Sequence, residues 1–427
     1  MPAQASDPAS AAGSRSRTCC SCDICLHLGV STSAQVTVKG VQSRLRVAIV
    51  TESFLPHVNG VTNSVRHLIE QLELLGHTVL VIAPGEGSTW HSRSRVVRVR
   101  GITLPGYRSF VIGLPDLALA EAIDDFAPDV VHLASPFVLG ASGLRAARRR
   151  GIPTVAVFQT DVAGFARSYR VARAPLLRPD AVAEAWVRRL HCRVDRTLVP
   201  SRASYAQLAA LGVPDLHLWG RGVSLDLFDP HRRDREMHRH WCPGGEVAVG
   251  YVGRLAHEKQ VHRLTALAGT PGVRLVVVGD GPARRELEQA LPTATFLGML
   301  RGEELATALA SLDVFVHTGD TETFCQTVQE AQASGVAVVA PAAGGPLDLV
   351  DPGRTGLLFH PGQQGGLPTA VNQLVRNAAL RTELAAAGRE AVADRDWGSL
   401  VRRLVDQHYS GVLRARQANS SHSLPAA

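Results

Sequence analysis

Two glutamates and two basic residues are the side chains in this sequence whose types and spacing best suit chemistry. Glu322 and Glu330 have seven residues between them, and Arg254 and Lys259 lie on an earlier loop. A carboxylate accepts two charge-assisted hydrogen bonds from sugar hydroxyls. Arg binds phosphate as a planar fork, and Lys binds it as a compact point charge. Together the four residues predict a site that holds a hexose, a ribose and a diphosphate.

The segment around the glutamates has the pattern of a strand, a loop and a helix. Residues 313–318 form an apolar run typical of a buried strand, and residues 325–334 predict a helix that ends at Gly335. The free N–H groups at the start of this helix favour an anion. We therefore expect Glu322 to face the donor sugar and Glu330 the ribose. The residues that supply the loop backbone are Thr323, Phe324 and Cys325.

Two other interpretations of the glutamate pair stay open. In glycosidases the two carboxyl groups lie roughly 5 to 9.5 Å apart, whereas eight residues along a helix rise about 12 Å. The spacing therefore favours two separate ligand contacts over an acid/base pair. A solvated helix face with two ordinary glutamates is the second alternative.

The use of lysine strengthens the interpretation of the basic pair. Of the 45 basic residues only Lys39 and Lys259 are lysines, so this arginine-rich chain places a rare lysine close to Arg254. A diphosphate leaving group needs cations of this kind. An exposed pair of loop residues is the alternative.

Length and composition fit a globular protein with two domains. The chain has 427 residues, and 45% of them are hydrophobic. The sequence lacks the run of about 18 apolar residues that a spanning helix needs. Residues 1–17 lack the apolar region of a secretory signal. We therefore expect a cytoplasmic protein.

Positive charge is concentrated in the first half of the chain, and the formal net charge is +7. Arginines cluster within residues 145–150, 167–178 and 188–196. Such a surface favours phosphorylated ligands or a peripheral contact with an anionic membrane, here the inner face of the plasma membrane. A solvated surface is equally compatible. Nucleic acid is disfavoured, because no interleaved aromatic residues or binding motif accompany the charge.

Residues 1–43 predict a disordered N-terminal extension. Its CxxC pair has no second pair that would complete a zinc site, and no helical pattern that would support redox chemistry. The cysteines of this segment are Cys19, Cys20, Cys22 and Cys25. The other three are expected to be reduced thiols, namely Cys192, Cys242 and Cys325.

From Arg44 onward strand and helix patterns alternate, which predicts an α/β fold with two doubly wound, Rossmann-like sheets. The expected strands of the first sheet are residues 45–50, 78–83, 96–99, 130–133, 154–158, 197–199 and 217–219, and those of the second are residues 247–252, 274–278, 295–297, 313–317 and 336–339. The expected divisions are a first domain at 44–225, a second domain at 226–398, a helix at 399–415 that packs across both, and a polar tail at 416–427. Ligands of such sheets bind beyond the carboxyl ends of the strands, where the candidate site residues fall. Gly60, at the end of the first loop, lets bare backbone approach a phosphate.

Several separated blocks resemble the retaining GT-B glycosyltransferases of family 4, over about residues 44–410. The blocks are residues 56–61, 199–201, 221–223, 253–255 with Glu258 and Lys259, 279–282, and the glutamate pair Glu322 and Glu330. Three further blocks are most similar to actinobacterial GDP-mannose-dependent α-mannosyltransferases that act on glycolipids, with plant-type sulfoquinovosyltransferases as near relatives. They are residues 51–62, 131–136 and 159–161.

The resemblance implies two Rossmann-like domains facing a cleft, an acceptor domain first and a nucleotide-sugar domain second. It implies GDP-mannose as the donor and a glycolipid or polyprenyl-type acceptor. By this resemblance, Arg254 and Lys259 would contact the donor diphosphate. Glu330 would contact the ribose, Glu322 the hexose, and backbone near Gly298 and Met299 the base. Gly60 would approach the phosphate, and His132 would lie beside the reacting sugar. Asp161 is the acceptor-side candidate, although related enzymes carry histidine there and at Gln159.

The expected chemistry is metal-independent and needs no cofactor beyond the donor substrate. Enzymes of the GT-A type hold a metal on a DxD motif, but the DxD here, Asp394-Arg395-Asp396, starts the last helix, away from a strand-end site. Arg254 and Lys259 would therefore stand in place of a metal. For retention, the resemblance implies front-face attack, with the leaving phosphate oxygen taking the acceptor proton.

Three alternatives to mannosyl transfer remain at this point. A UDP-sugar-dependent transferase of the sulfoquinovosyl or glucosyl type would use the same parts, since loop shape near the base separates guanine from uracil. A sugar-nucleotide epimerase would isomerise the donor without an acceptor. A non-catalytic sugar-binding protein would close on a ligand but has little need of Arg254 and Lys259.

Overall fold

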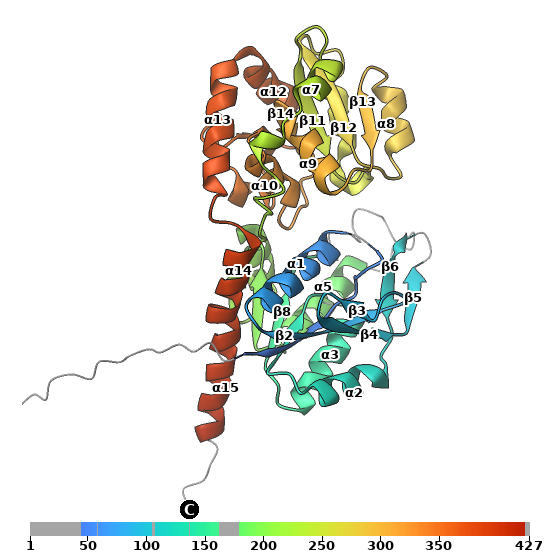
Figure 1. Cartoon of the computed structure of the whole chain (residues 1–427), viewed down its shortest axis with the longest axis vertical. Coiled ribbons are helices and arrows are strands. Elements are labelled where there is room, and N and C mark those ends of the chain that lie inside the picture. Colours follow the sequence, from blue (N-terminus) through green and yellow to red (C-terminus); the bar gives the residue numbers. More distant parts are fainter. Residues whose placement is uncertain (1–43, 58, 105–106, 136, 162–178, 423–427) are drawn as a thin grey trace, which may run out of the picture. The chain divides into compact units, whose positions relative to one another are not determined.

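A computed structural model describes residues 44–57, 59–104, 107–135, 137–161 and 179–422. The predicted extension at 1–43 and the arginines within 167–178 lie outside the described residues. Figure 1 shows the first sheet mainly in blue to green and the second in yellow to orange.

The first sheet has eight strands, all parallel except the edge strand β3. In spatial order they are β10 (Leu216–Leu218), β9 (Arg196–Val199), β8 (Thr154–Val157), β7 (Val130–Leu133), β1 (Arg46–Val50), β2 (Thr78–Pro84), β4 (Ser94–Val99) and β3 (Trp90–His91). The order reverses at β1, which pairs with β2 on one side and β7 on the other. A separate hairpin joins β5 (Gly101–Leu104) and β6 (Tyr107–Gly113).

The second sheet has six parallel strands and reverses in the same way. Its order is β13 (Thr295–Gly298), β12 (Val273–Val278), β11 (Val247–Val252), β14 (Val314–Val316), β15 (Ala337–Pro341) and β16 (Leu357–Phe359). Here β11 pairs with β12 and β14. In open α/β sheets, ligands bind outside the carboxyl ends of the strands at such a reversal.

Helices cover both sheets. In the first half they are α1 (Gly60–Leu74), α2 (Leu117–Phe126), α3 (Val138–Arg149), α5 (Pro179–His191) and α6 (Arg202–Ala210). In the second half they are α7 (Arg235–Trp241), α8 (Arg284–Ala290), α9 (Gly302–Ala310), α10 (Gln326–Ala333), α11 (Pro346–Leu349), α12 (Gly366–Arg376) and α13 (Ala378–Ala391). Short 3₁₀ segments are η1 (Pro230–Arg232), η2 (His257–Lys259) and η3 (Val261–Leu267).

Burial explains why the strands read as continuous apolar runs in the sequence. β1 is buried from its second residue onward, and alternate residues enter two different cores, one on each face of the sheet. The second sheet likewise separates two cores. Parallel sheets covered on both faces carry such runs because neither face meets water.

The C-terminal helical segment is longer than predicted and packs on the first core. It consists of α14 (Trp397–Arg403), the π-helical η4 (Leu404–Tyr409) and α15 (Ser410–His422). Its apolar side chains join the core that contains β1 and α1. The first part of the predicted polar tail, up to His422, is therefore helical, because sequence polarity alone does not end a helix whose preceding turns are buried.

None of the helices in the described part of the chain is long and apolar enough to cross a membrane.

Candidate donor site at the strand reversal of the second sheet

The second sheet brings the predicted donor residues to one edge. Arg254 and Lys259 follow β11, and Glu322 follows β14. These two strands are neighbours at the point where the strand order reverses. The pairing of these two strands therefore brings together residues that are far apart in sequence. The strand pattern in the sequence did not specify this pairing.

Lys259 and Glu322 form an ion pair. Lys259 Nζ donates to Glu322 Oε1 at 2.5 Å, and the two side chains are 31% and 16% exposed. Burial opposes both charges, but each partner more than offsets it, so the pKa of Lys259 is raised and that of Glu322 is lowered well below its usual range. Both groups are therefore charged at neutral pH.

His317, at the end of β14, is a third member of this cluster. Its Nε2 lies 3.5 Å from Glu322 Oε1, which is an ion-pair distance. Neither ring nitrogen makes a well-aligned hydrogen bond. Burial disfavours the imidazolium, but nearby Cys325 and Glu322 raise the pKa of His317 overall. Sequence reasoning missed His317, because a histidine that ends a strand carries no local signal of its partners.

Backbone contacts fix the two loops against each other. Thr318 Oγ1 donates to the carbonyl of Lys259 at 2.6 Å, and Arg263 donates to the Thr318 carbonyl and to Asp320. A side chain at Gly319 would meet His317 Nε2 at 3.1 Å and Glu322 Oε1 at 3.3 Å. The glycine thus keeps the space beside the carboxylate open.

The turn into α10 is tightly supported. Cys325 caps the helix in the left-handed region at φ 77°, which is uncommon for a residue with a side chain. The N–H of Gly345 donates to the carbonyl of Glu322 at 2.8 Å, and an added Cβ at Gly345 would overlap the carbonyl of Phe324. The Gly345 loop therefore holds Glu322 in place, a role that only the tertiary structure reveals.

Glu330 lies inside α10, and burial raises its pKa to about 7. A hydrogen bond from Gln326 and the charge of Arg221 partly oppose this shift. The helix begins at Gln326, so only the last part of the Glu322 to Glu330 spacing is helical. The predicted placement of Glu322 before the helix and of Glu330 inside it is therefore confirmed, whereas the estimate of helical rise counted loop residues as helical and does not apply.

Arg254 follows β11, in the same loop region as Lys259. Its Nη1 lies 3.4 Å from Glu258 Oε1, and its side chain is 40% exposed. The diphosphate role of Arg254 stays a prediction.

The predicted base-binding backbone at Gly298 and Met299 ends β13. The Gly298 carbonyl accepts the N–H of Gly279 at 2.7 Å, and the Met299 side chain is 56% exposed. One lone pair of the Gly298 carbonyl is thereby used within the protein, and the base-binding role of this backbone stays a prediction.

Gly279 should tolerate no side chain. An added Cβ would overlap the Gly253 carbonyl, and φ is +132°. We expect Gly279→Ala to lower the free energy of unfolding by at least about 3 kcal/mol. Gly269→Ala is the matched control, since it also has positive φ (+67°) but open space around it, and it should cost about 1 kcal/mol. Chemical denaturation measures both, and equal losses would contradict the packing argument.

The first sheet supplies the remaining predicted residues. Asn59 caps α1 by accepting the N–H groups of Val61 and Thr62, which places Gly60 at the first turn. Asp161 accepts a hydrogen bond from Gln207 at 3.2 Å. Asp161 borders segment 162–178, which lies outside the described residues.

His132 lies in the core at the end of β7. It is 1% exposed, its Nδ1 is 2.9 Å from the Tyr409 hydroxyl, and its ring packs edge-on against Trp219. Burial lowers the pKa of His132 to about 3, so the ring is neutral. These contacts give His132 a packing role against the C-terminal helix, and its role beside the reacting sugar stays a prediction.

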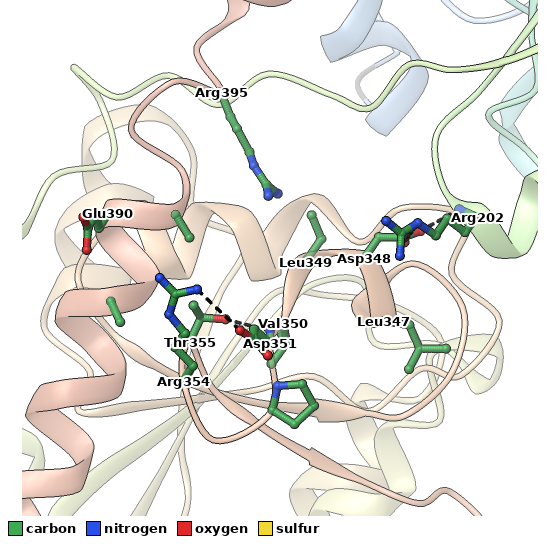
Figure 2. Close-up of a pocket in the computed structure, with 13 residues that line it drawn as sticks. Arg202, Leu347, Asp348, Leu349, Val350, Asp351, Arg354, Thr355, Glu390 and Arg395 are labelled. Carbon is green, nitrogen blue, oxygen red and sulfur yellow. Dashed lines mark hydrogen bonds and ion pairs between the residues drawn. The ribbon is translucent and has the colours of Figure 1, made fainter.

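A pocket of about 490 Å³ lies elsewhere, beside α11 and α13. Figure 2 shows Arg395, Arg354 and Glu390 around it, with Arg202 next to Asp348. None of the predicted donor residues lines this pocket. The position of this pocket therefore does not identify the predicted donor site.

Comparisons with known proteins identify the family of this chain. Residues 58–227 match the profile described as Glycosyltransferase Family 4, and residues 233–391 match Glycosyl transferases group 1. A GDP-mannose-dependent alpha-mannosyltransferase of Mycolicibacterium smegmatis is 50% identical over 88% of this chain and 100% of its own. The sulfoquinovosyl transferase SQD2 of Arabidopsis thaliana is 32% identical over 86% of this chain and 74% of its own.

Solved structures share the fold. Sucrose-phosphate synthase from Thermosynechococcus elongatus superposes with a TM-score of 0.72 at 22% identity, covering 87% of this chain and all of that one. Anabaena HepE in complex with UDP gives 0.68 at 18% identity, covering 86% and 100%. The two-sheet GT-B fold predicted from the sequence is thus confirmed, and the chain belongs to the family 4 glycosyltransferases.

Proposed function

We propose that this protein transfers mannose from GDP-mannose to a glycolipid or polyprenyl-type acceptor, with retention of the anomeric configuration and without a metal ion. The observation that carries the proposal is the Lys259–Glu322 pair at the strand reversal, followed at once by the helix that bears Glu330. The 50% identity to a GDP-mannose-dependent alpha-mannosyltransferase supports the choice of donor.

The donor would lie along the carboxyl edge of the second sheet. Arg254 and Lys259 would contact the diphosphate, and the start of α10 would add backbone N–H groups. Glu330 would accept both ribose hydroxyls, and Glu322 would accept hydroxyls of the hexose. Lys259 is already oriented by Glu322, so little reorganisation is needed when a diphosphate binds.

The difficult step is heterolysis of the bond from the anomeric carbon to the phosphate oxygen. Negative charge grows on the diphosphate while positive charge grows on the sugar. Cations that are fixed beforehand stabilise the leaving group by several kcal/mol in a site that excludes water. The acceptor oxygen then bonds to the same face of the anomeric carbon, and its proton passes to the departing phosphate oxygen.

The choice between donors needs a direct test, because a plant sulfoquinovosyl transferase is also similar to this chain. Purified protein would be incubated with GDP-mannose, UDP-glucose or UDP-sulfoquinovose and a membrane lipid extract, and products would be followed by mass spectrometry. Transfer of mannose from GDP-mannose supports the proposal. Transfer from a UDP-sugar alone would overturn the donor assignment while keeping the enzyme class.

We further propose that the first half of the protein contacts an anionic membrane. On α5, Val182 is 67% exposed and Trp186 is 40% exposed, and Arg189 follows on the same helical face. An exposed aromatic residue beside arginines is the pattern of a helix that rests in the lipid interface.

This membrane contact predicts a measurable loss in one variant. Trp186→Ser should weaken sedimentation with vesicles of anionic phospholipid about tenfold, because it removes apolar area that would enter the lipid. Trp90→Ser is the matched control, since Trp90 is 60% exposed on β3 and should have no effect. Equal binding by both variants and the wild type would refute the contact at α5.

A further inference from the structure

Arg221, in the segment that joins the two sheets, links the loops of the first sheet to one another. Its Nη1 donates to the Gly60 carbonyl at 3.1 Å, and its Nη2 donates to Gln159 Oε1 at 3.1 Å. Gly60 is the first residue of α1, whereas Gln159 follows β8. One planar guanidinium thus fixes two loops at the carboxyl edge of the first sheet, a geometry that Lys cannot reproduce.

The same side chain is electrostatically coupled to the donor carboxylates. Burial lowers the pKa of Arg221 to about 10, and the negative charges of Glu322 and Glu330 oppose this shift. At that pKa the guanidinium is still fully charged at neutral pH. The charge of this partly buried cation is therefore coupled to the two residues expected to hold the hexose and the ribose.

The backbone at Arg221 is anchored to α10, the helix that carries Glu330. Gln329 Nε2 donates to the Arg221 carbonyl and Gln326 Nε2 donates to the Gly222 carbonyl, both at 2.9 Å. Each amide uses one of its two N–H donors in this anchor. A displacement of α10 would therefore move Arg221.

Gln159 provides a second connection between the first sheet and the loop that carries Glu322. Thr323 Oγ1, in the loop beside Glu322, donates to the Gln159 carbonyl at 3.2 Å, and Gln159 Nε2 donates to the Ala134 carbonyl at 2.6 Å. An added Cβ at Gly60 would lie only 3.2 Å from Arg221 Nη1. A side chain at position 60 would therefore press against the guanidinium of Arg221.

We propose that Arg221 is a positioning residue for sugar transfer, which holds the Gly60 and Gln159 loops in register with the donor carboxylates so that acceptor and donor meet in one geometry. The proposal rests on the proposed transferase function. Because Arg221 acts through these loops, its loss should affect the transfer step far more than donor affinity. Sequence alone showed only a motif residue here, without its contacts.

The test compares Arg221→Lys and Arg221→Ala with the wild type at pH 8.5, above the pKa of about 7 of Glu330 in the wild type. Donor Kd is measured by calorimetry, and kcat is measured with whichever nucleotide sugar the wild type uses. We expect donor Kd to stay within threefold for Arg221→Lys while kcat falls at least 30-fold. Added guanidinium should restore at least fivefold of the lost kcat to Arg221→Ala, which a merely structural defect would not show.

Arg233→Ala is the matched control. The Arg233 guanidinium also donates to a backbone carbonyl and to a side chain, those of Leu312 and Asp313, at the amino end of β14. It should show no rescue by guanidinium. A kcat within threefold of the wild type in Arg221→Lys, or a loss confined to donor Kd, would overturn the proposal. If the wild type uses a UDP-sugar, the donor assignment fails, yet the ratios of variant to wild type still decide the role of Arg221.

A double-mutant cycle keeps the proposal falsifiable if Arg221→Ala does not fold. Gln159→Leu removes the acceptor of Nη2 without changing Arg221. If the two residues act as one unit, the double variant Gln159→Leu/Arg221→Lys should lose little more kcat than Arg221→Lys alone. Multiplicative losses would contradict a shared positioning role.

Discussion

Replacing Lys259 with methionine should lower kcat about 1000-fold, because a fixed cation at the leaving diphosphate is removed from the transition state. Methionine keeps the length of the side chain and removes its charge. The ion pair with Glu322 at 2.5 Å also disappears, so the pKa of Glu322 moves back toward its ordinary value. Steady-state kinetics with the native donor measures the loss.

Two further variants separate charge at this position from charge in general. Arg239→Met removes an exposed cation on α7 and should keep the wild-type rate. Lys259→Arg retains a cation and should recover part of the activity, although its planar fork does not match a point contact. A Lys259→Met enzyme with more than a tenth of the wild-type kcat would show that another group stabilises the leaving diphosphate.

Replacing Glu330 with alanine should weaken donor binding at least about 100-fold, since two charge-assisted hydrogen bonds to the ribose are lost. Calorimetric titration with GDP measures this directly, because GDP contains the ribose and no hexose. Glu383→Ala, on an exposed face of α13, controls for loss of negative charge and should bind as the wild type does. Unchanged GDP affinity in Glu330→Ala would remove the ribose assignment.

The raised pKa of Glu330, about 7, adds a pH dependence to the same measurement. The carboxylate accepts from two hydroxyls, whereas the protonated acid must use one oxygen as a donor. Affinity for GDP should therefore rise several-fold between pH 6 and 8, and about tenfold is the limit per pH unit. Glu330→Gln should bind weakly at all pH values and lose this slope. Any slope that remains in the variant comes from ionisation of the GDP phosphate.

The contribution of Glu330 to folding stability changes with pH in the direction opposite to GDP affinity. The folded pKa of Glu330 lies above the ordinary value of 4.5, so the folded protein binds more protons than the unfolded chain between pH 4.5 and about 7. Stability contributed by this group is therefore greatest at low pH and falls as pH rises through that window. Glu52, also with a pKa raised to about 7 by burial, adds to the same trend.

Local patterns were sufficient for most of the sheet. Val130–Leu133 and Val247–Val252 were predicted with the observed bounds, because buried parallel strands are short apolar runs between turns. The edge strands β3 and β16 were missed. An edge strand has one partner and one exposed side, so its sequence carries a weaker apolar signal.

The chemistry of the site was predicted better than its support. Lys259 and Glu322 were chosen by residue type, and their ion pair brings them together. By contrast, Gly345 and Arg221 depend on partners distant in sequence, which no local pattern reports. His317 lies close in sequence to its partner Glu322, but the fold of the loop between them decides that they meet. Glu330 was assigned to the right helix, while the rise expected for the whole motif failed because the loop before Gln326 is not helical.

The central claim is that the Lys259, Glu322 and Glu330 edge binds GDP-mannose without a metal ion. Its most direct test is calorimetric titration of the wild type with GDP-mannose, UDP-glucose and UDP-sulfoquinovose in buffer containing a chelator, each repeated with Glu330→Ala. We expect tight binding of GDP-mannose that is lost in the variant. Binding of no donor, with or without magnesium, would contradict the assignment of the donor site.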